Sequence, residues 1–279
     1  MNCILEKVME NMRVYNPEGS ALKRDQMRLV EVLQKFAEIC KEHDINWWLC
    51  SGTLLGAVRH GGFIPWDDDI DVSMLPKDYR KFVKVMKEWG DKDDYFYQCI
   101  ESEPEHVRVH GRFIKRGELL PSADKRAEYY RFKGISMEVF CIEKSSEFAA
   151  HLAKSFYLNM VHPTQYIKNK ALRVFLIRFI QVLNFGFFIP IIRLFGRLIN
   201  PKNDYHCKLG SGFYDQPFHI EDIFPLKTVT FEGIEFPAPN DTDMYLTRLY
   251  GDWRKLPSHE QIIKSIHTNL YREEILARE

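Results

Sequence analysis

Apolar residues in the first part of the chain recur with the spacing of amphipathic helices and short buried strands. In residues 21–43 they fall three or four positions apart, which is the period of one helix face. A second helix is expected from about 76 to 89, because this segment begins with proline and ends at glycine. Between these helices we expect the strands "INWWLCSG" and "IDVSM", separated by the short helix "TLLGAVRH".

The pattern changes in the second half of the chain. Extended segments are expected at "YFYQCIES" and "VRVHGRFIK", followed by a strong strand at 135–143, "ISMEVFCIE". A helical region follows to about residue 200, then a hairpin-like stretch, "KTVTFEGIEFPAPND", and a helix, "TDMYLTRLYGDW", that stops at Gly251. This order predicts a mixed α/β protein with a helical C-terminal half.

Composition places the chain among ordinary folded proteins. It has 279 residues, 45% hydrophobic and 28% charged, which is enough for a well-buried core. The formal net charge is zero, so the total charge gives no indication of a nucleic-acid partner. The N-terminus lacks a signal peptide's long apolar stretch, and the cysteines lack metal-finger spacing, so we expect buried thiols in a cytoplasmic protein. The cysteines are Cys3, Cys40, Cys50, Cys99, Cys141 and Cys207.

The zero net charge hides a strongly basic segment. Residues 148–203 contain no Asp or Glu but eight Lys and Arg residues. Within this segment, residues 171–199 are apolar but interrupted by arginines, a glycine and a proline, so we expect two short amphipathic helices broken at Gly186–Pro190 rather than a transmembrane span. Two interpretations stay open: a buried helical pair with solvated arginines, or a surface that rests on the inner face of an anionic membrane.

Four carboxylates are crowded into five positions at the start of the strand expected near residue 70: Asp67, Asp68, Asp69 and Asp71. Asp69 and Asp71 are two residues apart, so in a strand they project from the same face. At an effective dielectric of about 20, two such carboxylates repel by roughly 2–3 kcal/mol, and a divalent cation turns this repulsion into attraction. Oxygen ligands suit Mg²⁺ or Mn²⁺. The alternative is a solvated acidic turn, but the apolar residues on both sides of Asp71 favour a strand.

Two further features accompany the acidic run. The turn at Ser51, Gly52 and Thr53 opens a helix whose free N–H groups could hold a phosphate. Glu138 lies among apolar neighbours in the strand at 135–143. It is either a third carboxylate that completes the metal site or acts as a base, or an edge-strand residue that faces water.

The segment "SGTLLGAVRHGGFIPWDDDIDV" resembles the signature of the LicD family, relatives of fukutin and fukutin-related protein within the nucleotidyltransferase-like superfamily. Gly52-Thr53, Asp69-x-Asp71 and Glu138 match the family's turn, paired acids and third acid. "FEGIEFPAPNDTDMYLTRLYGDWRKLP" is also similar to LicD sequences, so the resemblance spans roughly 22–267. There are two departures: the third acid is commonly Asp in relatives, and residues 148–203 match no family pattern.

The resemblance implies a nucleotidyltransferase-like, polymerase β-type mixed sheet with added C-terminal helices. It divides the chain into an N-terminal extension (1–20), a catalytic core (21–145), a basic helical insertion facing a membrane or acceptor (146–205), and a family-specific segment that packs on the core (206–279).

The resemblance also implies an activity. LicD-like proteins transfer a phospho-alcohol such as phosphocholine from a CDP-activated donor to a hydroxyl of a glycan or its lipid-linked precursor, releasing CMP. Asp69, Asp71 and Glu138 would hold the Mg²⁺ or Mn²⁺. The candidates for donor-phosphate contacts, each alternatively an ordinary surface cation, are Arg59, His60, Arg112 and Lys115.

The remaining candidates are one aromatic residue and two C-terminal polar residues. Trp66, with Trp47 and Trp48, could form an aromatic wall for a quaternary ammonium group, and core packing is the alternative. Asp252 and His267 recur in the family and could line the pocket, while Asp252 is alternatively a helix-end residue. Two rival functions are a metal-dependent glycosyltransferase that uses a nucleotide-sugar and a non-catalytic glycan-assembly factor.

Overall fold

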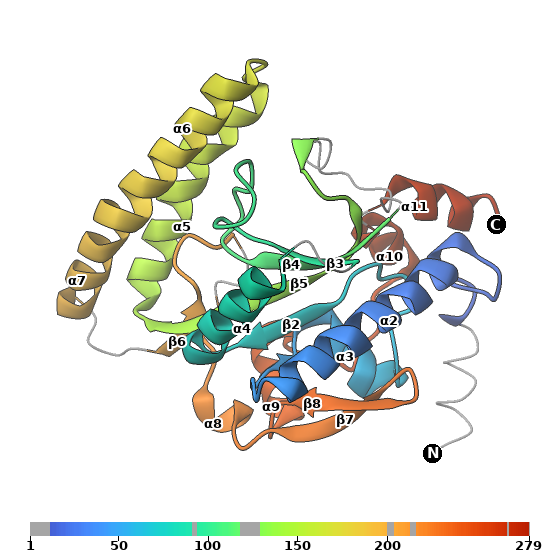
Figure 1. The fold of residues 1–279 in the computed structure, drawn as a ribbon. Coiled ribbons are helices and arrows are strands. Elements are labelled where there is room, and N and C mark those ends of the chain that lie inside the picture. The colour runs from blue at the N-terminus through green and yellow to red at the C-terminus, as the bar shows by residue number, and fades with distance from the viewer. Residues whose placement is uncertain are drawn as a thin grey trace.

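The computed structural model describes residues 12–90, 94–117, 129–199, 204–212, 216–266 and 268–278. Its centre is a six-stranded sheet in the order β1-β2-β5-β4-β3, with β6 paired to the second half of β5 (Figure 1). Only β2 and β5 run parallel among these pairs, so the sheet is mixed, as predicted. The strands are β1 (Trp48–Leu49), β2 (Asp71–Met74), β3 (Tyr95–Gln98), β4 (Gly111–Arg116), β5 (Gly134–Ser145) and β6 (Asp204–Cys207).

Two long helices, α2 (Ala21–Glu42) and α4 (Pro76–Trp89), cover one face of the sheet (Figure 1). The Ser20 side chain accepts a hydrogen bond from the backbone N–H of Lys23 and so caps α2, while α4 begins with proline. Rings from both helices meet a ring of β4: Phe36 lies 5.0 Å from Phe82 and 5.7 Å from Phe113, centroid to centroid. Both predicted helices are confirmed.

The C-terminal elements pack on the side of α3 (Ser51–His60). The tip of the hairpin formed by β7 (Lys227–Phe231) and β8 (Ile234–Ala238) is hydrogen-bonded to the turn after α3. There the Glu232 N–H donates to the carbonyl of Gly61 at 3.0 Å, and its carboxylate accepts from the Phe63 N–H at 3.1 Å. The other C-terminal helices are α8 (Ile220–Ile223), α9 (Thr242–Tyr250), α10 (His259–Ser265) and α11 (Asn269–Leu276).

A helical arm projects from the sheet (Figure 1). It contains α5 (Glu147–Val161), the 3₁₀ turn η2 (His162–Tyr166), α6 (Lys170–Leu183), the π-helical turn η3 (Asn184–Phe188) and α7 (Ile189–Ile199). The predicted break at Gly186–Pro190 is wrong, because the helix continues from α6 through η3 into α7. At η3 the Ile189 N–H donates to the carbonyl of Asn184, five residues back. This wider turn precedes Pro190, and the helix continues through the proline into α7.

The continuous segment Lys170–Leu198 is the one helix in the described part of the chain that is long and apolar enough to cross a membrane, judged by length and composition alone. Only 28% of its most apolar window is buried in the protein. The buried residues contact α5 and the loop before β4; Gln181, for example, donates its side-chain amide to the carbonyl of His106 at 2.8 Å. One side of the helix is therefore anchored and the other is exposed.

The cysteines that the structure describes are all buried, as expected from their apolar surroundings. Cys40, Cys50, Cys99, Cys141 and Cys207 are free thiols, and burial raises the pKa of Cys40, Cys50, Cys99 and Cys141. Cys3 lies outside the described residues.

Close packing between α3 and the loop that follows it gives a first prediction. A Cβ atom on Gly56 would lie 2.4 Å from the carbonyl oxygen of Gly62 and 2.8 Å from the nitrogen of Ile64. Because these are backbone atoms and cannot rotate away, Gly56→Ala should lower the free energy of unfolding in urea by about 1–3 kcal/mol.

Gly186→Ala is the matched control, since a Cβ there would meet nothing within 4 Å. We expect this variant to be unchanged or more stable by up to about 1 kcal/mol. Equal unfolding midpoints for the two variants would contradict the packing argument.

Candidate active site

The parallel pairing of β2 and β5 brings two of the predicted acids together. Asp71 and Glu138 are direct partners in the register of these strands, and their exposed fractions are 7% and 8%. Asp69 lies two residues before Asp71 and is partly buried. Burial raises the pKa of Asp69 well above its usual range, and the charges of Asp67, Asp71 and Glu138 raise it further. The three predicted acids therefore share one electrostatic environment.

The surroundings of the Asp71 carboxylate favour binding of a cation. Burial raises its pKa, and the charges of Glu138 and Asp67 add to this effect. Its backbone N–H donates to the Thr53 hydroxyl at 2.8 Å, which ties β2 to the start of α3. Its Oδ1 atom is buried and has no hydrogen-bond partner among the described residues. A buried carboxylate oxygen without a partner is costly, and a bound cation would satisfy it.

Glu138 has the opposite surroundings. Its Oε1 lies 2.9 Å from Nη1 of Arg108 and 3.7 Å from Nε of Arg112, and its Oε2 lies 3.2 Å from Nε2 of His110. Burial alone would raise the pKa of Glu138, but His110, Arg108 and Arg112 outweigh it and lower the pKa well below its usual range. Glu138 is therefore an ionised counter-charge for Arg108 and Arg112, with the ring of His110 beside its other oxygen.

Sequence reasoning named Arg112 but missed Arg108 and His110. The signal is present in "VRVHGR", where basic residues alternate with apolar residues and glycine. In an extended segment this period places all three on one face. Arg112 is the direct partner of Glu138 across β4 and β5, which fixes that face on the acidic side of the sheet.

The start of α3 is packed tightly against the acidic run. A Cβ atom on Gly52 would lie 2.7 Å from Oδ2 of Asp67, so no larger residue fits there without displacing that carboxylate. Ser51 is buried and has a φ of +53°, a conformation that is uncommon for a residue other than glycine. The Ser51 side chain lowers the pKa of Asp71 and so partly offsets the effect of burial. Asp68 is fixed separately, by a 2.5 Å hydrogen bond from the Thr268 hydroxyl.

A second group of predicted residues lies at the other end of α3, where their contacts are structural. Arg59 donates to the carbonyl of Trp253 at 2.8 Å and to the ring of His60 at 2.9 Å. Burial, assisted by the charge of Arg59, lowers the pKa of His60 to about 4, so this ring is neutral at pH 7. Trp66 is buried, with its ring 5.4 Å from that of Tyr15.

The remaining candidates are not brought to the acids. Lys115 projects from the other face of β4 and pairs with Glu31 of α2 at 2.9 Å. Asp252 is exposed in the turn after α9, and His267 lies outside the described residues. Trp47 and Trp48 are buried in the core, as in the packing alternative.

The side chains around β2 do not form a complete metal cage. Among the residues that the structure describes, no group of three or more His, Cys, Asp or Glu side chains has the arrangement of a metal site. The contacts of Glu138 give the physical reason, because its two oxygens already face Arg108 and His110. Asp69 and Asp71 remain as a pair of oxygen donors that fits a divalent cation bound together with an anionic ligand.

Comparison with known proteins places this site in a family. Residues 44–176, which include Asp69, Asp71 and Glu138, match the model described as "LicD/FKTN/FKRP, nucleotidyltransferase domain". These residues form a LicD-family domain. The resemblance noted in the sequence is thereby confirmed, and the mixed sheet is the core of a nucleotidyltransferase-like fold.

Similarity to individual proteins extends beyond this LicD domain. The chain is 26% identical over 259 residues to the lipopolysaccharide cholinephosphotransferase LicD of Haemophilus influenzae, covering 86% of this chain and 93% of the relative. It is 40% identical over 53 residues to the mouse ribitol-5-phosphate transferase FKTN, covering 19% of this chain and 12% of the relative. It is 50% identical over 34 residues to human ribitol 5-phosphate transferase FKRP, covering 12% and 7%.

The raised pKa of Asp69 predicts that this residue destabilises the metal-free protein. When the pKa of a carboxyl group is higher in the folded than in the unfolded protein, ionising that group destabilises the fold. The free energy of unfolding therefore falls as the pH rises through the pKa of the folded state. In chelator-containing buffer at pH 7, Asp69→Asn should therefore raise the free energy of unfolding by about 1 kcal/mol or more. The advantage should shrink as the pH falls toward about 4, where the unfolded carboxyl is also protonated.

The control for this prediction is Asp44→Asn, which removes the charge of a fully exposed side chain at a φ of +47°. Asparagine tolerates this conformation, so the unfolding free energy should stay the same. A destabilised Asp69→Asn variant at pH 7 would refute the predicted repulsion.

Proposed function

We propose that this protein transfers a phospho-alcohol group, such as phosphocholine, from a CDP-activated donor to a hydroxyl of a cell-surface glycan or its lipid-linked precursor. In this reaction a bond forms between the acceptor oxygen and the phosphorus, the bond from phosphorus to CMP breaks, and the hydroxyl proton is released. The broader class, a phosphotransferase, follows from the LicD family and from the cholinephosphotransferase and ribitol-phosphate transferases to which the chain is similar.

The observation that carries the proposal is the Oδ1 atom of Asp71, which is buried and has no hydrogen-bond partner among the described residues. Asp71 begins β2, close to Asp69 and to the first turn of α3. A Mg²⁺ or Mn²⁺ ion held by Asp69 and Asp71 would supply neutralising charge for the donor diphosphate and for the departing CMP. The protein's own contribution is placement. Thr53 fixes the backbone of Asp71, and the tight turn at Gly52 leaves room for a phosphate oxygen to approach backbone N–H groups.

We assign Glu138 a positioning role in place of the ligand or base role expected from sequence. A carboxylate with a strongly lowered pKa is a weak base, and its oxygens are already occupied by Arg108 and His110. Glu138 instead holds these two side chains, together with Arg112, on the face that carries Asp71. Cations held there would contact the phosphate oxygens of the donor, because guanidinium groups match phosphate geometry.

The central test is CMP release from purified protein across a panel of CDP-alcohols. We expect CMP from at least one donor with Mg²⁺ or Mn²⁺ present and none after chelation. Asp71→Asn should lower kcat/KM by roughly 100- to 1000-fold, the scale for losing one preorganised electrostatic contact in an active site. Asp44→Asn is the matched control and should retain full activity.

Two outcomes would replace the proposal with its rivals. Release of UDP from a UDP-sugar, with no CMP from any CDP-alcohol, would indicate a glycosyltransferase. Unchanged glycan modification in cells carrying Asp69→Ala with Asp71→Ala would indicate a non-catalytic assembly factor.

A second prediction compares two cations of one strand. Arg112 and Lys115 were both expected to contact donor phosphate, but only Arg112 faces Glu138. Arg112→Gln should lower kcat/KM for CMP release by about 10- to 100-fold, the scale for losing one charged hydrogen bond. Lys115→Gln should stay within about twofold of the parent, since this residue pairs with the exposed Glu31 of α2, away from Glu138. A larger loss in Lys115→Gln than in Arg112→Gln would overturn the assignment of the phosphate-binding face.

A further inference from the structure

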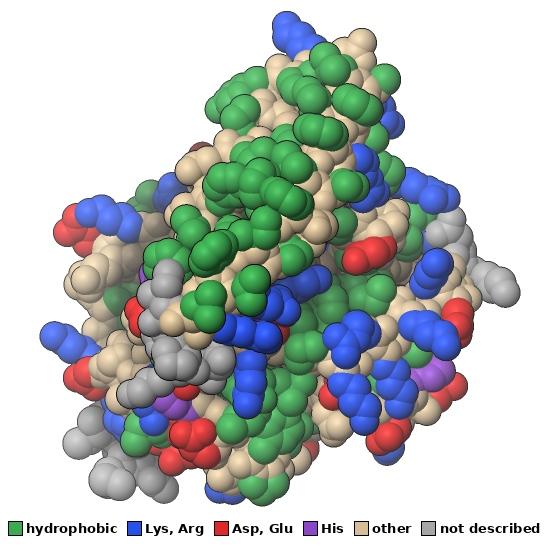
Figure 2. Space-filling view, turned by 90° about the vertical axis from the view of Figure 1, so that its left-hand side faces the viewer, with side chains coloured by type: hydrophobic (Ala, Val, Ile, Leu, Met, Phe, Trp, Pro, Cys, Tyr) green, Lys and Arg blue, Asp and Glu red, His purple; other side chains and the backbone are tan. Residues whose placement is uncertain are grey.

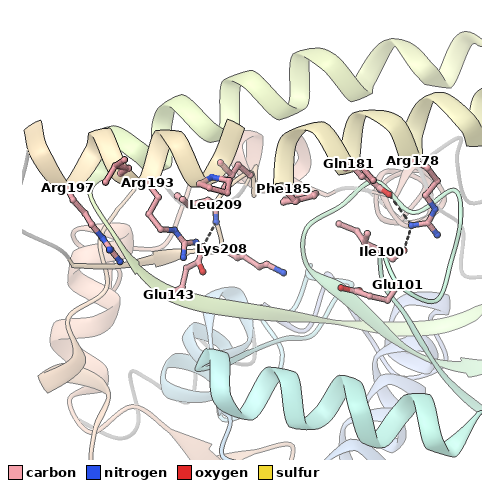
Figure 3. A pocket seen from close by; sticks show the side chains of 14 residues that line it. Ile100, Glu101, Glu143, Arg178, Gln181, Phe185, Arg193, Arg197, Lys208 and Leu209 are labelled. Atoms are coloured by element: carbon pink, nitrogen blue, oxygen red, sulfur yellow. Dashed lines mark hydrogen bonds and ion pairs between the residues drawn. The ribbon is translucent and has the colours of Figure 1, made fainter. Parts of the chain in front are cut away.

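A large cavity lies between the helical arm and the sheet, and it shares no residue with the acidic site. Its volume is about 710 Å³ (Figure 3). One side of the continuous helix forms its roof, with Arg178, Gln181, Phe185, Arg193 and Arg197 projecting toward the sheet. The floor comes from the turn after β3, from Glu143 of β5 and from the residues after β6.

The cavity is lined by four cationic and two acidic side chains, so it carries excess positive charge: Arg178, Arg193, Arg197, Lys208, Glu101 and Glu143. Nη2 of Arg193 forms an ion pair with Oε1 of Glu143 at 2.9 Å, but Nε of Arg193 is buried and has no hydrogen-bond partner among the described residues. Neither Arg197 nor Lys208 pairs with a carboxylate in the described part of the chain, and Lys208 lies 5.7 Å from the ring of Tyr79. An anionic group would satisfy these cations.

The outer side of the same helix carries an apolar ridge. Seven large apolar side chains on it are each more than half exposed, and Figure 2 shows hydrophobic side chains gathered along the arm. This ridge consists of Phe175, Phe179, Val182, Phe187, Leu194, Phe195 and Leu198. Val182 and Leu194 also line the cavity, so the apolar ridge and the cationic cavity are continuous.

The π-helical turn keeps the ridge on one side of the helix. Phe175, Phe179 and Val182 are spaced by four and three residues, as on any helix face. The next member, Phe187, comes five residues later, and this longer step coincides with η3, where one extra residue is accommodated in the turn. Without that extra residue the ridge would rotate away from the cavity mouth beyond Pro190.

We propose that this surface binds an anionic lipid bilayer, with the ridge at the boundary of the headgroups and the acyl chains and the cavity around a phosphate-bearing headgroup. A bilayer supplies both an apolar interior and negative charge, which are the two properties that the ridge and the cavity need. A second copy of the chain fits less well, because residues 148–203 contain no acid and two arms would bring their arginines together. This inference does not depend on the proposed reaction.

The test is co-sedimentation of the full-length protein with vesicles of phosphatidylcholine alone or with 30 mol% phosphatidylglycerol, about the anionic content needed for a clear surface charge. Binding should require the anionic lipid and weaken with salt. Because each cation removed near an anionic surface lowers partitioning by roughly fivefold, Arg197→Gln with Lys208→Gln should reduce it by about 25-fold. Lys227→Gln with Lys255→Gln, at exposed sites outside both cavity and ridge, is the matched control and should bind as the parent does.

The ridge is tested separately with Phe175→Gln and Phe187→Gln combined, which should reduce vesicle binding at least tenfold while leaving the melting temperature unchanged, since both side chains are exposed. The control is Leu270→Gln with Leu276→Gln, two exposed apolar residues of α11. Three results would overturn the proposal: no binding to anionic vesicles, binding that the ridge variant retains and inorganic pyrophosphate abolishes, or a stable dimer that the ridge variant dissociates.

Discussion

Two carboxylates fixed side by side by a pair of parallel strands determine how the site around them is built. Asp71 and Glu138 cannot both be buried and charged without compensation, and the protein compensates them differently. Glu138 is compensated by two arginines, Arg108 and Arg112, and by the ring of His110 beside its other oxygen. For Asp71 and Asp69, burial and the neighbouring carboxylates raise the pKa of both groups, so a bound cation would favour their ionised forms. The result is a site in which a pair of carboxylates lies directly beside a cluster of basic side chains, across the β2–β5 pairing.

The acidic run is kept in place by segments distant in the sequence. Thr268 holds Asp68, Glu232 holds the turn before the acidic run, and Gln26 of α2 donates to the carbonyl of Asp67 at 2.8 Å. Each contact fixes backbone or side chain without neutralising Asp69 or Asp71. Segments outside the acidic run therefore hold it in place, and none of these contacts supplies a cation to Asp69 or Asp71.

The parts of the fold that could be predicted are those with a local signal. The apolar period and the terminal residues of α2 and α4 locate both helices, and β2 and β5 appear as apolar runs. The pairing of Asp71 with Glu138 could not be derived, because strand register depends on contacts between distant segments. Lys115 was misplaced for a related reason: the face of β4 to which it belongs becomes clear only once Arg112 is known to oppose Glu138. Pro190 was a misleading local signal, since a π-helical turn absorbs it.

The family match and the folding unit do not coincide. Residues 44–176 exclude α2, whose Leu29, Leu33 and Phe36 are buried in the main core. The same boundary cuts α6 after its first turns and leaves out β6, which pairs with the second half of β5. The segment that sequence comparison recognises therefore shares its core and its sheet with residues on both sides of it. A fragment cut at the limits of the family match would therefore uncover apolar side chains that α2 now covers and would leave the end of β5 without the strand it pairs with.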